Sequence, residues 1–164
     1  MFEFLKKYEG GSFYFTLGDD LRIQCKENVS VDVCCGVYIV YGYDGEKEEV
    51  VYIGSSGHVD EDNKLIPRKG GLRRRIYGRQ NSKSGEPLFR NILWPQLMGN
   101  SINKLKIVWY NTEGDNPLLV EYCLILQFLI QYHKFPLWNN ELKISSRSKE
   151  SLDSFISDNV VEFL

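Results

Sequence analysis

A single carboxylate stands in the most apolar stretch of the sequence. Glu121 is the only charged residue between positions 117 and 130. Removing a carboxylate from water without a partner is unfavourable by several kcal/mol, so Glu121 is expected to meet a metal ion or an arginine, or to hold a proton through a raised pKa. The alternative is that Glu121 lies near the start of a helix, interacts with the helix dipole and reaches solvent.

A block of positive charge lies between residues 63 and 90. It contains nine basic residues and one acidic residue, whereas the rest of the chain has eleven basic and twenty-one acidic residues and the net charge is -2. Such a block suits a phosphate backbone, because neutralised phosphates release their counterions. The alternatives are a solvated arginine-rich helix and a surface for an acidic protein. The residues predicted to contact nucleic acid are Arg68, Lys69, Arg73, Arg74, Arg79 and Lys83.

Two tyrosines lie on a predicted β-hairpin. GVYIVYGY (36–43) and VVYIG (50–54) are rich in β-branched and aromatic residues and flank an Asp-Gly turn signal. If the loop centres on Gly45, Tyr38 lies directly opposite Tyr52, and a shift of one residue in the loop would break this pairing. The same register puts Val40 and Val50 on the tyrosine face, and Val37, Ile39, Val51 and Ile53 on the other.

An arginine-rich helix is predicted after Gly70-Gly71, in LRRRIYGRQ. Leu72 and Ile76 face inward, and Arg75 is the arginine that we expect to reach the tyrosine face, because it follows Leu72 by three residues. A glycine pair that leads into such a helix offers backbone amides, a positive dipole end and guanidinium groups to a phosphate.

The remaining elements are less distinctive. Strands are predicted at FYFTL, RIQCK and 104–110, and a loop at 55–70. Helices are predicted near 2–8, at 87–97, from Pro117 onward with Asn116 as N-cap, and around 152–156.

Length and composition favour one domain of α+β type. A chain of 164 residues buries enough surface to fold without disulfides or a structural metal. The four cysteines contain no CxxC pair and only two histidines accompany them, so buried reduced thiols are expected rather than a zinc site. No secretory signal and no membrane-spanning run is visible, and we expect an intracellular, cytoplasmic protein.

The order of these landmarks resembles the GIY-YIG nuclease superfamily. Gly36-Val37-Tyr38 is followed by Tyr52-Ile53-Gly54, and then by Arg75, Glu121 and Asn139. The resemblance covers residues 36–140. It implies a small three-stranded antiparallel sheet flanked by helices, with residues 1–35 as an N-terminal accessory segment and 141–164 as a C-terminal helical extension.

The resemblance also implies an activity, the hydrolysis of DNA phosphodiester bonds. By analogy, Tyr38 and Tyr52 flank the attacking water, Arg75 holds the phosphate, and Glu121 binds one divalent ion, Mg²⁺ or another such as Mn²⁺. Asn139, or Asn140 in its place, lies nearby, and Lys69 is a secondary candidate for proton transfer. Since a free phenol has a pKa near 10, Tyr38 would need a nearby cation to act as a base.

This chain departs from the simplest family pattern at three places. Residues 55–70 look like an insertion, Arg79 stands where many relatives have a histidine, and Val37 replaces isoleucine. The absence of a recognisable DNA-binding module in the sequence slightly favours a restriction-type enzyme over a structure-specific repair nuclease. A catalytically inactive nucleic-acid-binding module and a protein-interaction domain are the alternatives. Besides DNA, a homodimer or a partner protein that supplies specificity is expected.

Overall fold

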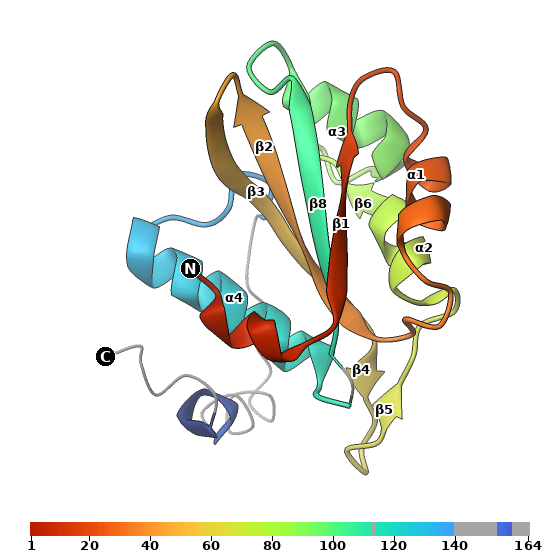
Figure 1. Ribbon diagram of the computed structural model, residues 1–164, viewed down its shortest axis with the longest axis vertical. Coiled ribbons are helices and arrows are strands. Elements are labelled where there is room, and N and C mark those ends of the chain that lie inside the picture. Colours follow the sequence, from red (N-terminus) through yellow and green to blue (C-terminus); the bar gives the residue numbers. More distant parts are fainter. Residues whose placement is uncertain (113, 140–153, 159–164) are drawn as a thin grey trace.

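The computed structural model describes residues 1–112, 114–139 and 154–158 and has the predicted α+β architecture (Figure 1). Its centre is an antiparallel sheet of four strands in the order β1-β8-β2-β3. The strands are β1 (Gly10–Phe15), β2 (Gly36–Asp44), β3 (Lys47–Ser56) and β8 (Lys104–Asn111). The prediction of three strands was wrong, because β1, from the segment taken as accessory, pairs with β8 from Gly10↔Tyr110 to Phe15↔Leu105.

The hairpin of β2 and β3 is present, but its register differs from the prediction. Tyr38 lies opposite Gly54 and Tyr52 lies opposite Val40, and the register shifts by one residue at Val40/Tyr41. The two tyrosines are therefore diagonal neighbours on one face rather than direct partners. Because of this β-bulge, Val51 packs on the tyrosine face and Val50 packs on the opposite face, which is the reverse of the predicted arrangement.

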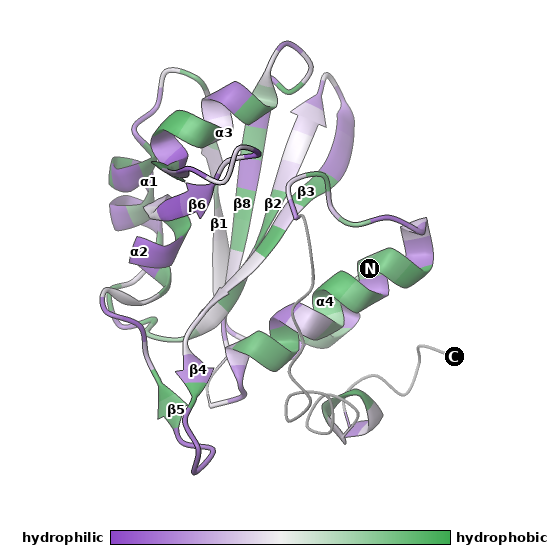
Figure 2. Cartoon of the chain, turned by 180° about the vertical axis from the view of Figure 1, so that it is seen from behind, coloured by the Kyte–Doolittle hydropathy of each residue, from purple (hydrophilic) through white to green (hydrophobic). Residues whose placement is uncertain are grey.

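Helices cover both faces of the sheet (Figure 1). On one face, α4 (Pro117–Tyr132) and the short 3₁₀ helix η1 (Glu3–Lys7) enclose an apolar layer with Val37, Ile39 and Ile53. The other face, which carries Tyr38 and Tyr52, is covered by α1 (Leu21–Asn28), α2 (Gly71–Tyr77) and α3 (Arg90–Met98). Figure 2 shows α4 as largely hydrophobic and α1 and α2 as mostly hydrophilic.

The run RIQCK forms part of α1, not the strand that was predicted. Asp20 caps this helix, because its carboxylate accepts hydrogen bonds from the backbone amides of Arg22 and Ile23. Leu21 and Cys25, four residues apart, are both fully buried. This spacing places both on one helical face, which packs against β1 and α2.

The segment between β3 and β8 is more structured than expected. The predicted loop contains a small hairpin of β4 (His58–Val59) and β5 (Leu65–Ile66). The predicted α2 is present, with Leu72 and Ile76 fully buried. β6 (Arg79–Asn81) and β7 (Pro87–Phe89) form a second small hairpin. Residues 87–89, predicted as the start of a helix, therefore form a strand, and α3 begins at Arg90.

Three further predictions concern the cysteines and the chain's C-terminal part. Cys25, Cys35 and Cys123 are buried, as expected, whereas Cys34 is exposed, and none forms a disulfide. Residues 154–158 are helical, in line with the helix predicted around 152–156. Asn140 and most of the predicted C-terminal extension lie outside the described residues.

In the part of the chain that the structure describes, no helix has the length and apolar character needed to cross a membrane.

Candidate active site

Four of the six residues predicted to be catalytic line one cavity of about 400 Å³ beside the sheet. They come from four separate segments: Tyr52 from β3, Arg75 from α2, Glu121 from the second turn of α4, and Asn139 from the segment after α4. Arg79, Gln80, Asn81, Arg90 and Trp138 complete the wall. The fold thus brings together side chains that are up to 87 positions apart in the sequence.

Ser55 connects the carboxylate of the site to its arginine. The Ser55 hydroxyl donates a short hydrogen bond to Oε2 of Glu121, and Nε of Arg75 donates to the Ser55 carbonyl at 3.0 Å. Since Ser55 is the next-to-last residue of β3, the end of this strand fixes both charged groups. Within the described residues, Nε is the only engaged donor of the Arg75 side chain, so its terminal nitrogens are available to a ligand.

The environment of Glu121 opposes its ionisation in part. Burial raises the pKa of the Glu121 carboxyl above its usual value, while the hydrogen bond from Ser55 and the guanidinium groups of Arg75, Arg90 and Arg68 act in the opposite direction. Desolvation is the largest of these effects. A cation bound next to Glu121 would favour the charged form.

The tyrosine pair has one member at the cavity and one beneath it. The two rings lie 5.9 Å apart between centroids, and Tyr52 lines the cavity, whereas Tyr38 is fully buried. The Tyr38 hydroxyl has no hydrogen-bond partner among the described residues. Burial raises the pKa of Tyr38 well above its usual value, and the opposing charges of Arg90 and Arg75 do not reverse this. Burial therefore favours the neutral phenol at Tyr38.

Close packing explains the two glycines of the Gly-Val-Tyr and Tyr-Ile-Gly motifs. A Cβ at Gly54 would lie 2.7 Å from the Tyr38 hydroxyl and 2.8 Å from the Tyr52 ring. A Cβ at Gly36 would lie 2.2 Å from the carbonyl oxygen of Tyr110 on the neighbouring strand. All three distances are too short for a real Cβ atom, so glycine at these positions lets the tyrosines and the strands approach each other.

Arg90 is the site residue that the sequence reasoning missed. Its side chain is only 1% exposed, and its charge lies over the rings of Tyr38 and Tyr52 at 5.7 and 5.3 Å from their centroids. Nη2 donates to the Tyr52 hydroxyl at 3.2 Å, Nε donates to Gln80 at 3.0 Å, and Nη1 donates to the backbone carbonyl of Arg75. No carboxylate forms a salt bridge with Arg90 within the described residues.

A sequence signal for Arg90 did exist. Leu93 and Trp94, three and four residues later, are buried, so helical periodicity places Arg90 on the inner face of α3. An arginine on such a face needs hydrogen-bonding partners or a ligand, because burial of an unpaired charge is unfavourable. In the sequence this residue was counted only as part of the basic block.

Asn139 holds its segment against β3. Its side-chain oxygen accepts a hydrogen bond from the Ile53 amide at 2.9 Å, and its side-chain nitrogen donates to the Ile53 carbonyl at 2.9 Å. The amide of Trp138 donates to the Val51 carbonyl at 2.8 Å. Asn139 therefore lies at the cavity wall as predicted, but both ends of its amide are engaged with backbone.

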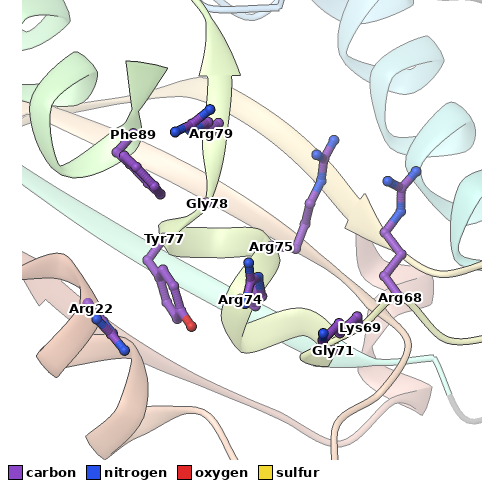
Figure 3. Close-up of a pocket in the computed structure, with 10 residues that line it drawn as sticks. All are labelled: Arg22, Arg68, Lys69, Gly71, Arg74, Arg75, Tyr77, Gly78, Arg79 and Phe89. Atoms are coloured by element: carbon purple, nitrogen blue, oxygen red, sulfur yellow. The ribbon is translucent and has the colours of Figure 1, made fainter. Parts of the chain in front are cut away.

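A larger basic groove of about 760 Å³ adjoins the cavity, and Arg75 and Arg79 line both. Four of the six residues predicted to contact nucleic acid line this groove: Arg68, Lys69, Arg74 and Arg79. Arg22 of α1, which was not predicted, joins them. Figure 3 shows Arg68 and Arg75 pointing to the same side of the groove. Lys69 lines the groove and does not line the cavity in which Tyr52 lies.

The other two predicted contact residues lie elsewhere. Nε and Nη2 of Arg73 donate to the Val29 carbonyl at 2.9 and 2.6 Å, and Nη2 also donates to the Lys26 carbonyl. Arg73 therefore joins α2 to the C-terminal end of α1. Lys83 is exposed in the turn between β6 and β7 and does not line the groove.

Glu121 would be the main protein ligand of a divalent ion in this cavity. No group of three histidine, cysteine, aspartate or glutamate residues converges in the described ranges. Mg²⁺ does not need such a group, because at phosphate-binding sites one or two carboxylates hold it together with water and phosphate oxygens. The donor set therefore fits Mg²⁺ bound together with a phosphate, and does not fit zinc.

Comparison of the chain with protein-family models, curated proteins and solved structures gave no match.

Proposed function

We propose that this chain is an endonuclease of the GIY-YIG type that hydrolyses DNA phosphodiester bonds with a divalent cation. The observation that carries the proposal is the position of Glu121 in one cavity with Arg75 and Tyr52, from three separate elements. The same cavity contains two further arginines, Arg79 and Arg90, and opens beside a groove lined with cations. A phosphate is the common ligand of such a set of charges.

Arg75 is the residue we assign to the scissile phosphate. Its Nε is held by the Ser55 carbonyl, so the planar guanidinium group is oriented and its terminal nitrogens reach the cavity. The nearby groups Tyr38, Tyr52 and Glu121 raise the pKa of Arg75, which keeps it protonated. A fixed guanidinium group stabilises the charge that develops on the phosphoryl oxygens and needs little reorganisation during the reaction.

Tyr52 is the phenol that contacts the reacting groups in this proposal. Its oxygen accepts a hydrogen bond from Arg90, so its own proton is directed to another acceptor. In the cavity, an oxygen of the phosphate or the attacking water fills that role. Tyr38 supports the Tyr52 ring from below, and this differs from the role as base that the family resemblance implies.

Glu121 is the residue that would hold Mg²⁺ or Mn²⁺. The cation, when bound, would neutralise charge on the phosphate and on the leaving oxygen. Ser55 orients the carboxylate through Oε2, and the arginines around the cavity reduce the repulsion between Glu121 and an incoming phosphate.

Nicking of supercoiled plasmid DNA tests this function. We expect the parent chain to nick DNA with Mg²⁺ and not with EDTA. Glu121→Gln and Arg75→Ala should each lower the rate by a factor of roughly 100 or more, while the DNA is still retained on a filter. Glu27→Gln is the matched control, since Glu27 is an exposed residue of α1 that lines neither the cavity nor the basic groove.

Two results would contradict the proposal. One is equal nicking by the parent, Glu121→Gln and Arg75→Ala, which would point to a contaminating nuclease. The other is a parent chain that is retained normally on DNA but cleaves neither plasmid nor linear DNA, whether Mg²⁺ or Mn²⁺ is supplied. That result would favour the inactive binding module.

A further inference from the structure

We infer that the basic groove binds an unpaired DNA strand, whose bases stack on Tyr77 and Phe89 while its phosphates meet the arginines. The inference names the substrate class of the proposed nuclease and so builds on the proposed function. It predicts that the chain prefers DNA with a single-stranded region next to the cleaved bond over fully paired duplex.

The charge of the groove suits a phosphate backbone. Six cationic side chains line it, and no acidic residue does. They come from α1, the turn before α2, α2 itself and β6: Arg22, Arg68, Lys69, Arg74, Arg75 and Arg79. Because Arg75 and Arg79 also line the cavity, a strand that lies in the groove continues to Glu121 and Tyr52.

Two aromatic rings lie in the same groove. Phe89 is 47% exposed, so part of its ring is accessible to a ligand, and the Arg79 guanidinium lies 4.7 Å from its ring centroid. The Arg22 guanidinium lies 5.9 Å from the Tyr77 ring centroid. Figure 3 shows both rings on one side of the groove, with Arg22 and Arg79 beside them, and the guanidinium groups of Arg68 and Arg75 on the other side.

This combination of accessible aromatic rings and cationic side chains favours an unpaired strand over its competitors. In a single strand, phosphates follow one side and bases present their faces to the other, where aromatic rings stack on them. In a duplex the base faces are already stacked, so the rings would find only edges and backbone. An acidic protein would use the cations and would leave the exposed Phe89 ring without a matching partner.

Fluorescence anisotropy in EDTA tests binding without cleavage. The probes are a labelled oligothymidine of about ten nucleotides, a labelled duplex of the same length, and poly-glutamate as an unlabelled competitor. We expect the single strand to bind about tenfold more tightly than the duplex, and poly-glutamate to compete poorly. Phe89→Ala should weaken single-strand binding about tenfold and leave duplex binding unchanged.

Two further variants keep the test decisive. Tyr14→Ala is the matched control, because Tyr14 on β1 is 49% exposed, carries a cation (Lys104) over its ring at 4.7 Å, and lies outside the groove. It should bind both probes like the parent. Phe89→Leu retains an apolar side chain without a π face, so it serves if Phe89→Ala fails to fold, and it should show the same loss for the single strand.

The outcomes separate this inference from the proposed function. Equal affinity for the two probes, an equal effect of the Phe89 variants on both, or efficient competition by poly-glutamate would overturn the unpaired strand as ligand. In that case the dependence of plasmid nicking on Glu121 and Arg75 would still support the nuclease. Conversely, a Phe89-dependent preference for the single strand without any nicking would support the groove and contradict the catalytic role.

Discussion

Nη2 of Arg90 lies 3.2 Å from the hydroxyl oxygen of Tyr52, so a buried cation is hydrogen-bonded to the phenol that faces the cavity. No carboxylate pairs with this arginine in the described part of the chain. The contact therefore links α3, for which the sequence predicted no site residue, to β3, which carries the Tyr-Ile-Gly motif.

The first prediction concerns this contact. Arg90→Lys keeps the charge but loses the planar group that reaches Tyr52, Gln80 and the Arg75 carbonyl at once. A hydrogen bond to a charged group contributes about 1.5 to 3 kcal/mol, so we expect the nicking rate to fall by roughly 10- to 100-fold. Tyr52→Phe should cause a similar loss.

A double-mutant cycle distinguishes this role from mere packing. If Arg90 acts by orienting the Tyr52 hydroxyl, Arg90→Lys combined with Tyr52→Phe should lose little more activity than either change alone. Thermal unfolding of each variant measures separately how much the substitution destabilises the fold. Additive losses of activity, with unfolding temperatures that fall in parallel, would contradict the orienting role.

The second prediction follows from the raised pKa of Glu121. The native state holds a proton between the unfolded value of 4.5 and the raised pKa, so stability falls as pH rises through this window. Glu121→Gln removes the charge and can still accept the Ser55 hydrogen bond. We therefore expect it to raise the unfolding temperature at neutral pH and to change it little below pH 4.5.

Calorimetry or circular dichroism at several pH values measures this effect. The exposed Glu27→Gln serves again as control and should show no comparable dependence. A Glu121→Gln variant that is less stable than the parent at neutral pH would mean that the arginines around the cavity outweigh the desolvation of the carboxylate.

The third prediction concerns the glycine of the Tyr-Ile-Gly motif. Gly54→Ala would place a methyl group 2.7 Å from the Tyr38 hydroxyl, in a core that has no room for it. Such overpacking destabilises a protein by about 1 to 3 kcal/mol, and it should displace both tyrosines and lower nicking. Gly18→Ala is the matched control, because no atom lies within 4 Å of its added Cβ and its φ is not positive. Equal unfolding temperatures for the two variants would contradict the close approach.

The fourth prediction separates neighbouring arginines of α2. Arg74 is exposed in the groove, so Arg74→Gln should weaken DNA binding and reduce the slope of log affinity against log salt by about 0.7 to 0.9, with little change in stability. Arg73 is bound to the Val29 and Lys26 carbonyls, so Arg73→Gln should lower the unfolding temperature and leave the salt slope nearly unchanged. Salt titrations of both variants check this, and identical slopes would contradict it.

The sequence predicted the elements whose patterns are local. The hairpin, α2, β8 and the Asn116 cap of α4 were read correctly, since turn residues, apolar spacing and capping signals determine them over a few residues. The register of the hairpin was wrong because a β-bulge at Val40/Tyr41 depends on packing across the sheet. α1 was missed because a short polar run was assigned by β-propensity without using its cap, Asp20.

Part of the site could be predicted because a charged residue next to apolar residues is easy to recognise in a sequence. Glu121 was found because nothing else charged surrounds it in the sequence, and the position of Arg75 followed from its spacing to Leu72. Arg90 was missed because it was considered only as part of the basic block and not by its helical spacing to Leu93 and Trp94. The depth of Tyr38 below Tyr52 likewise depends on the diagonal pairing, which the predicted register did not contain.

The hydrogen bonds of Trp138 and Asn139 to β3 have a consequence for self-association. β3 is one of the two edge strands of the sheet, and strands in that position attract other chains through their unpaired backbone groups. Here the Val51 carbonyl and both backbone groups of Ile53 are already satisfied by the chain itself. This edge is therefore closed to a strand from a second copy over these residues, and an assembly that extends the sheet there would first have to displace the wall of the cavity formed by Trp138 and Asn139.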